Sequence, residues 1–174
     1  DRGDAPGEMV DALPVVNLVP GVTALVGDQG GAPGHTCALL GTGHVKCWGN
    51  NNFGALGLGD ALTRGDAPGE MGDALPSVDL GTGRTATALA EGTSHTCAVL
   101  DTNQVKCWGN NNFGALGLGD TATRGDAPGE MGDSLLAVNL GTGRTAKATA
   151  VGFDHSCALL ATGKVKCWGP NGTG

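Results

Sequence analysis

The sequence predicts an all-β fold made of about three stacked repeats of roughly 60 residues, and three observations support this prediction. First, the chain repeats itself without gaps, because 44 of the 60 positions in 45–104 are identical in 105–164. Second, glycine supplies 33 of the 174 residues, which is typical of tight turns between short strands. Third, short apolar runs lie between those turns. A repeat of this length does not bury its apolar face alone, so neighbouring repeats are expected to stack.

Each repeat is predicted to hold four short antiparallel strands, as the middle repeat illustrates. A short apolar run ends at a Gly-Thr-Gly turn, and a run of alternating small residues ends at Gly92. A hairpin with a three-residue turn follows, and a long polar linker leads to the next repeat. The expected strands are, in order, 77–80, 85–90, 95–100 and 105–108.

The hairpin carries apolar side chains on both of its faces. A strand that is apolar on both sides is expected to lie between two neighbouring layers. Four-stranded blades that stack around an axis satisfy this condition, so we predict β-propeller blades. One face is expected to carry Cys97, Val99, Val105 and Cys107, and the other Ala98, Leu100 and Trp108.

All six cysteines fall into three pairs with nine residues between the partners. If a three-residue loop is centred on the threonine between them, the two cysteines of a pair lie opposite each other on adjacent strands, within the range of a disulfide. Free thiols and a zinc site remain alternatives, although zinc sites favour shorter cysteine spacings. Disulfides would indicate the periplasm, the cell surface or the exterior. The pairs are Cys37/Cys47, Cys97/Cys107 and Cys157/Cys167.

We expect residues 1–174 to form one repeat domain. The first repeat is atypical, because its cysteine hairpin follows a longer linker and it lacks the Gly-Thr-Gly-Arg-Thr-Ala signature. Three blades are too few to close a ring. We therefore expect further repeats in a longer chain, or association of copies through blade faces, as a six-bladed pair or a head-to-tail filament. The units are roughly 1–49, 50–109 and 110–169, with a partial linker at 170–174.

Charge and hydropathy exclude two classes of partner. The net charge is −7 and the ten basic residues are scattered, which argues against nucleic acid. No apolar run approaches the ~20 residues that a membrane-spanning helix needs. We therefore expect neither nucleic-acid binding nor a membrane span.

The hairpin and the linker after it resemble a known repeat. His-Thr-Cys-Ala-Val-Leu, a turn, then Val-Lys-Cys-Trp-Gly-Asn-Asn-Asn-Phe-Gly-Ala-Leu-Gly-Leu-Gly-Asp is similar to the regulator of chromosome condensation repeat, and all three units match it. The resemblance implies a β-propeller, usually of seven blades, that binds other proteins. Its members range from a nucleotide exchange factor to a plant photoreceptor and a secreted β-lactamase inhibitor. The paired cysteines look like secreted bacterial versions, notably myxobacterial ones.

Two departures bear on what the resemblance implies. The tryptophan cluster of the photoreceptor has no counterpart here, and the exchange factor needs a whole propeller. Histidine and tryptophan recur once per unit instead, so we assign them packing and hydrogen-bonding roles. These repeat residues are His35, His95 and His155, and Trp48, Trp108 and Trp168.

Other polar motifs are interpreted as structural. Arg-Gly-Asp recurs at Arg2–Asp4, Arg64–Asp66 and Arg124–Asp126, which suits a repeated turn better than an adhesion ligand. Linker acids such as Asp60 and Glu70 lack the spacing of a calcium loop. Asn171-Gly172-Thr173 fits a glycosylation acceptor that also arises by chance. His44 and the Asn110–Asn112 run are expected on the surface.

The sequence therefore predicts a non-catalytic extracellular scaffold for protein–protein interaction or self-assembly at the cell surface. It offers no catalytic set, cofactor site or metal site, and an enzyme is the least favoured class. A subunit of an extracellular filament or sheath is the alternative. A secreted inhibitor, or a module that binds carbohydrate or calcium, is a more distant one. The expected partners are copies of the chain, further repeats of a longer chain, or another extracellular protein.

Overall fold

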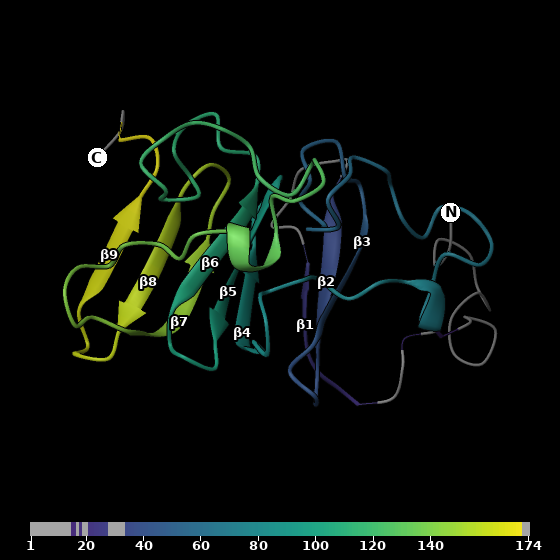
Figure 1. The fold of residues 1–174 in the computed structure, drawn as a ribbon, viewed down its shortest axis with the longest axis horizontal. Coiled ribbons are helices and arrows are strands. Elements are labelled where there is room, and N and C mark those ends of the chain that lie inside the picture. Colours follow the sequence, from purple (N-terminus) through teal and green to yellow (C-terminus); the bar gives the residue numbers. More distant parts are fainter. Residues whose placement is uncertain (1–14, 17, 19–20, 28–33, 172–174) are drawn as a thin grey trace, which may run out of the picture.

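A computed structural model describes residues 15–16, 18, 21–27 and 34–171. It contains three antiparallel sheets of three strands each, which follow one another along the chain (Figure 1). Sheet A consists of β1 (Val22–Gly27), β2 (His35–Leu40) and β3 (Val45–Gly49). Sheet B consists of β4 (Ala86–Glu91), β5 (His95–Leu100) and β6 (Val105–Gly109). Sheet C consists of β7 (Ala146–Val151), β8 (Ser156–Leu160) and β9 (Val165–Trp168).

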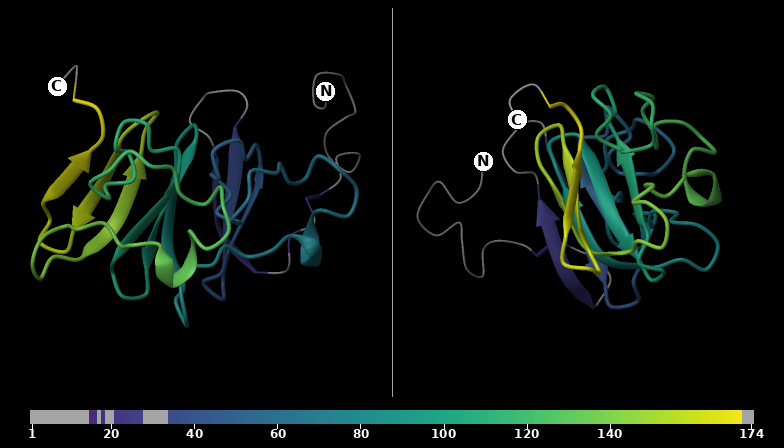
Figure 2. Two further views of the ribbon diagram at one scale, coloured as in Figure 1. Left: turned by 45° about the horizontal axis from the view of Figure 1, so that its top comes forward. Right: turned by 90° about the vertical axis from the view of Figure 1, so that its left-hand side faces the viewer.

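The sheets stack in a row, with sheet B between sheets A and C (Figures 1 and 2). Two apolar cores lie between them, and in each core the cysteine-bearing face of one sheet packs on the tryptophan-bearing face of the next. The predicted all-β class and the stacked blades are therefore confirmed. The first core joins Cys37, Leu39, Val45 and Cys47 to Ala98, Leu100 and Trp108. The second joins Cys97, Val99, Val105 and Cys107 to Ala158, Leu160 and Trp168.

The hairpin register is the one that the cysteine spacing predicts. Cys97 lies opposite Cys107, and the Leu100 N–H donates to the Gln104 carbonyl across a three-residue loop, at 2.8 Å. The equivalent cysteines pair in the same way in sheets A and C. All three pairs form disulfides, with Cα atoms 4.0 to 4.1 Å apart.

The sheets have three strands each, and the fourth strand predicted for each blade is not found as such. The run 77–80 is not a strand of its own repeat, because it lies beside β3 of the sheet before it. There the Val78 N–H donates to the Val45 carbonyl at 2.8 Å, and Arg64 bridges to Gly49. Between these contacts the segment bends at η2 (Gly72–Ala74), where Gly72 has a φ of 69°, so a regular ladder does not form.

Sheet B has the same kind of outer segment. The Val138 N–H donates to the Val105 carbonyl at 2.8 Å, Arg124 bridges to Gly109, and η3 (Gly132–Ser134) lies between them. We call residues 64–80 and 124–140 the outer segments of sheets A and B. The predicted unit boundaries at 49/50 and 109/110 remain predictions.

Candidate functional site

The interface between sheets A and B contains a chain of three hydrogen bonds. The His35 ring Nε2 lies 2.7 Å from the Thr96 hydroxyl, and that hydroxyl donates to the Ala55 carbonyl at 3.0 Å. The same carbonyl accepts the Trp108 indole N–H at 2.9 Å. Because the Thr96 proton is already directed at Ala55, the geometry assigns the donor role to His35 Nε2.

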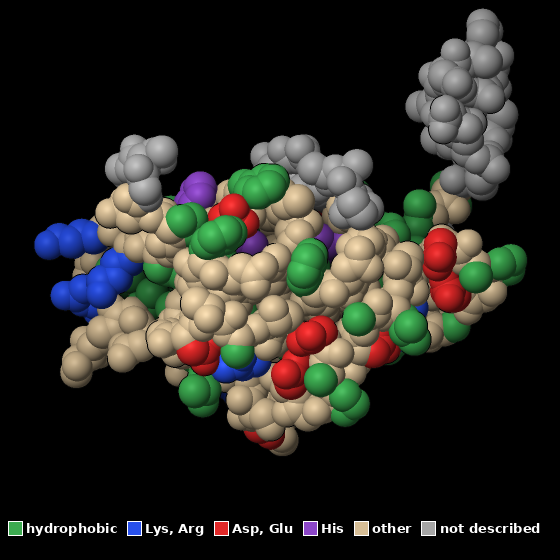
Figure 3. Space-filling view, turned by 90° about the horizontal axis from the view of Figure 1, so that it is seen from above, with side chains coloured by type: hydrophobic (Ala, Val, Ile, Leu, Met, Phe, Trp, Pro, Cys, Tyr) green, Lys and Arg blue, Asp and Glu red, His purple; other side chains and the backbone are tan. Residues whose placement is uncertain are grey.

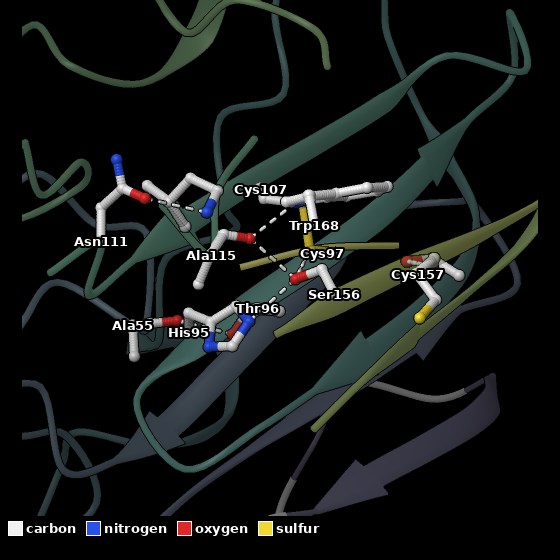
Figure 4. The surroundings of a disulfide bond; sticks show 12 residues. Ala55, His95, Thr96, Cys97, Cys107, Asn111, Ala115, Ser156, Cys157 and Trp168 are labelled. Atoms are coloured by element: carbon white, nitrogen blue, oxygen red, sulfur yellow. Dashed lines mark hydrogen bonds between the residues drawn. A yellow bond between two sulfur atoms is a disulfide. The ribbon is translucent and has the colours of Figure 1, made fainter. Parts of the chain in front are cut away.

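The interface between sheets B and C repeats this arrangement with serine in place of threonine (Figure 4). His95 Nε2 lies 2.9 Å from the Ser156 hydroxyl, which donates to the Ala115 carbonyl at 2.8 Å. The Trp168 indole N–H donates to the same carbonyl at 2.8 Å. One backbone carbonyl of the preceding linker therefore accepts the tryptophan N–H directly, and the repeat histidine is linked to it through the hydroxyl. The first repeat contributes its histidine to such a set and the last repeat its tryptophan. The other two repeat residues lie outside these sets, and His155 is exposed and Trp48 half-buried.

A buried asparagine holds each accepting loop in place. Asn51 and Asn111 are fully buried, and their side-chain carbonyls accept the N–H groups of Leu56 and Leu116 at 2.9 Å. The Asn111 amide also donates to the Asp120 backbone and side chain. The prediction that the asparagine run is a loop surface is wrong for its middle residue. Asparagine recurs at this position in two units, as Asn51 and Asn111, and this recurrence is the sequence signal that could have indicated a structural role.

One charged residue distinguishes the first interface from the second. Glu91 is buried, its carboxylate accepts the Cys37 N–H at 3.0 Å, and it lies 3.1 Å from His35 Nε2. The equivalent residue in sheet C is Val151. His35, Cys37 and Glu91 lie close enough together to suggest a metal site. However, the Cys37 sulfur is bonded to Cys47 and is not a thiolate, so the arrangement fits a direct contact between His35 and Glu91 better than a metal site.

Burial of His95 makes stability depend on pH. Burial, with the nearby His35 and His155, lowers the pKa of His95 from 6.5 to about 4. The unfolded chain therefore takes up a proton that the folded chain excludes, so stability is present above pH 6.5 and is lost as pH falls toward 4. We expect a loss of about 2 kcal/mol between pH 6.5 and 5.

Denaturant unfolding at several pH values tests this expectation, with two variants for comparison. His95→Gln keeps a donor for Ser156 but does not titrate, so the change between pH 6.5 and 5 should shrink. His44→Gln alters an exposed ring that is not among the groups that shift the pKa of His95, and it should leave that change as it is. An unaltered pH profile in His95→Gln would contradict the assignment.

Buried lysines fasten the outer segments to the sheets. Lys46 and Lys106 are 6% and 7% exposed, and their ammonium groups donate to the carbonyls of Gly72 and Gly132 at 2.6 and 2.8 Å. Burial lowers the pKa of Lys106, while nearby acids oppose the shift. The sequence did not single these lysines out, because lysine normally lies on the surface.

A second contact anchors the outer segment of sheet B. The Asp133 carboxylate accepts the backbone N–H and the hydroxyl of Thr82, at 2.9 and 2.5 Å. These hydrogen bonds, more than the nearby Lys106 and Arg84, lower the pKa of Asp133. The outer segment of sheet B is therefore held by two contacts, one between Asp133 and Thr82 and one between Lys106 and Gly132.

The Arg-Gly-Asp motifs at 64–66 and 124–126 lie in structured turns. Arg64 pairs with Asp60 at 2.6 Å, and the Glu70 carboxylate accepts the N–H groups of Gly65 and Ala67. These backbone hydrogen bonds lower the pKa of Glu70. Arg124, Asp120 and Glu130 repeat the arrangement. The copy at Arg2–Asp4 lies outside the described residues, as does most of the Asn171–Thr173 tripeptide.

The cysteine-bearing face of sheet C is open in the described part of the chain. Val165 is 61% exposed, whereas its equivalents Val45 and Val105 are fully buried. Leu159 is 39% exposed, against 1% for Val99. A hollow of about 540 Å³ lies over this face, lined by residues that include His155, Cys157 and Cys167. We call this surface the open face of sheet C.

Exposed aromatic side chains mark one end of the blades. Phe53, Phe113 and Phe153 are 41%, 58% and 65% exposed, and they are the only phenylalanines of the chain. The Asn110 N–H donates to Ser94 O, which places the loop of Phe113 beside the turn before β5, at the end of the blade where β7 and β8 also turn. Seen from above, this end carries scattered apolar side chains (Figure 3).

Within the described residues, the structure has no helix with the length and apolar character of a membrane span.

Comparison with known proteins gives one matching family. Residues 31–55, 87–115 and 146–174 match the model described as "Regulator of chromosome condensation (RCC1) repeat". Over 142 residues the chain is 30% identical to the "Probable E3 ubiquitin-protein ligase HERC4" of Homo sapiens. That alignment covers 80% of this chain but only 12% of HERC4, so the chain spans about an eighth of this relative's length.

Two solved structures show the same fold. One is human WBSCR16, with a TM-score of 0.65 at 19% identity, covering 86% of this chain and 33% of that one. The other is yeast RCC1 (Prp20) bound by Kap60, with a TM-score of 0.57 at 19% identity, covering 85% and 32%. These similarities confirm the predicted propeller blades, with this chain as part of a propeller.

Proposed function

Because three stretches of this chain match the regulator of chromosome condensation repeat, we propose that it is a non-catalytic scaffold that binds other proteins through repeat-to-repeat contacts. The observation that carries this proposal is the open face of sheet C. Its residues match those that sheets A and B bury against the next repeat, and an apolar surface of this kind favours a protein partner. Another copy of the chain, or a further repeat of a longer chain, is the partner that the repeats themselves suggest.

The polar groups support a scaffold over an enzyme. In the two complete interfaces, the histidine rings are engaged with the hydroxyls of Thr96 and Ser156. The buried lysines are engaged with backbone carbonyls. These groups hold repeats together and are not directed into a pocket that a substrate enters.

The disulfides support an extracellular or cell-surface location. Three intrachain disulfides are compatible with an oxidising environment, where such bonds persist. The phenylalanine-bearing end offers a surface for a second, different protein in that environment. The similar proteins named above come from human and yeast, so the secreted bacterial version of the repeat stays a prediction.

Sedimentation velocity of the chain over a range of concentrations tests the proposal. We expect self-association, and we expect Val165→Asp to weaken it at least tenfold, because a charge on the open face would have to be buried in the contact. Leu136→Asp is the matched control, since Leu136 is 68% exposed and lies off the open face. A chain that stays monomeric at every concentration, or association that Val165→Asp leaves unchanged, would contradict the proposal.

A further inference from the structure

One imidazole, one carboxylate and two sulfurs meet at the interface between sheets A and B. A ring nitrogen of His35, the sulfur of Cys37 and a carboxylate oxygen of Glu91 all lie within 4.8 Å of one another. Cys47 adds a second sulfur, because it is bonded to Cys37. Tetrahedral zinc takes these ligand types and holds their atoms ~3–4 Å apart. Small side-chain movements therefore suffice to bring the four groups to zinc distances.

The strand register places these groups together. His35 and Cys37 are two residues apart in β2, so they point to the same face, and Cys47 lies opposite Cys37 on β3. Glu91 comes from β4 of the other sheet, where its carboxylate accepts the Cys37 N–H at 3.0 Å and lies 3.1 Å from His35 Nε2. All four residues are buried. An ion held here would therefore join two repeats at a site closed to bulk water.

The disulfide closes this site in the oxidised chain. Zinc binds thiolates, whereas the sulfurs of Cys37 and Cys47 are bonded to each other. We propose that reduction of this disulfide opens a zinc site that takes ligands from both sheets. The site belongs to the first interface and not to the open face of sheet C, so it does not depend on the proposed self-association. Its ligands are His35, Cys37, Cys47 and Glu91.

The opening step is thiol–disulfide exchange with a dithiol reductant. Two electrons pass from the two thiols of the reductant to the Cys37–Cys47 bond, and the reductant becomes a cyclic disulfide. The sulfurs of Cys37 and Cys47 take up the two protons that these thiols lose. Zinc then displaces both protons into water as it binds the thiolates. His35 offers the lone pair of Nε2, with the ring proton on Nδ1, and Thr96 keeps its hydrogen bond to Ala55.

A hollow along the inner strands gives an ion access to the carboxylate. It has a volume of about 430 Å³ and lies along β1, β4 and β7. Glu91 is the one charged residue among the described residues that line it. A cation that enters the hollow therefore meets a negative group and no positive one. The hollow thus favours entry of a cation at the Glu91 side of the site.

The second interface is a natural comparison, because it lacks one ligand. His95, Cys97 and Cys107 occupy the equivalent positions there (Figure 4). The position of Glu91 is taken by Val151, whose side chain has no ligand atom. Reduction of the second disulfide therefore leaves a set of three ligands, so zinc should bind there at least about tenfold more weakly.

Zinc titration of the whole chain, before and after reduction, tests the proposal. The chain is reduced with a dithiol, freed of it without oxygen, and titrated with Zn²⁺ in competition with a chromophoric chelator. Every sample carries Cys157→Ser and Cys167→Ser, so that the outer pair does not bind zinc itself. We expect one tightly bound ion in the reduced chain and none in the oxidised chain. Co²⁺ in place of zinc should show thiolate-to-metal charge-transfer absorption.

Three further variants locate the site. Glu91→Gln keeps an acceptor for the Cys37 N–H but removes the charge, so the zinc affinity of the reduced chain should fall at least about tenfold. Asp73→Asn removes the charge of an exposed acid and is the matched control, which should leave the affinity unchanged. Val151→Glu supplies the missing ligand at the second interface, so the reduced chain should bind a second ion tightly.

Binding that Glu91→Gln leaves unchanged would overturn the proposal, because the cysteines alone would then account for it. Binding by an unfolded chain gives this same result, since Glu91 and Cys37 are 54 residues apart in the sequence and meet in the folded structure. A reduced chain that binds no zinc, or an oxidised chain that binds it equally well, contradicts the proposal too. A loss of structure on reduction that zinc reverses in the parent chain, but not in Glu91→Gln, would support it.

Discussion

Replacing Trp108 with alanine is expected to lower the free energy of unfolding by about 3–5 kcal/mol. The side chain is fully buried between sheets A and B, and its indole N–H donates to the Ala55 carbonyl. It also lies under the linker, where a Cβ on Gly57 would come within 2.7 Å of the indole nitrogen. The alanine variant would therefore leave a cavity at the interface and remove one of its three hydrogen bonds.

Denaturant unfolding followed by circular dichroism measures this loss without relying on tryptophan fluorescence. Trp48→Ala is the matched control, because Trp48 occupies the same repeat position but is half-buried. It should cost clearly less. Equal losses in the two variants would show that the interface contacts of Trp108 do not decide its contribution.

Loss of the inner disulfide is the second large effect. Replacing Cys97 and Cys107 together with alanine should cost about 2–3 kcal/mol from the freedom gained by the unfolded chain. A further loss follows from packing, because both residues are fully buried in the core between sheets B and C.

The pair Cys157 and Cys167 provides the comparison. Its sequence separation is also 10, so the chain-entropy contribution is the same. Cys167 is exposed and Cys157 half-buried, so the packing loss should be smaller. Under mild reduction, mass spectrometry should detect opening of this outer pair first. Opening of Cys97–Cys107 before it would contradict the difference in burial.

The hairpin was predictable from the sequence because local rules determine it. A strand alternates its side chains with a period of two, so the loop length alone places Cys97 opposite Cys107. The structural roles assigned to the repeat histidines and tryptophans rested on recurrence. Recurrence did not identify the acceptor, because Ala55 contributes a backbone carbonyl that carries no sequence signal of its own.

The features that the sequence did not reveal depend on contacts between repeats. The run 77–80 follows the linker, yet it lies beside β3 of the preceding sheet, and strand order along the chain does not say which edge a segment joins. Asn111 and Lys106 are polar residue types that are usually exposed, and their burial follows from hydrogen-bond partners elsewhere in the chain. Glu91 occurs in one repeat only, so the comparison of repeats did not single it out as a structural residue.

The polar link at the interfaces has a consequence for how such a protein grows in length. His35 meets Thr96 and His95 meets Ser156, each across a separation of 61 residues. Every repeat therefore carries the donor for its successor and the acceptor for its predecessor. Duplication of a single gene segment of one repeat would add a blade together with a working interface, and no new pair of complementary residues would have to arise. The near identity of 45–104 and 105–164 is what such copying would leave in the sequence.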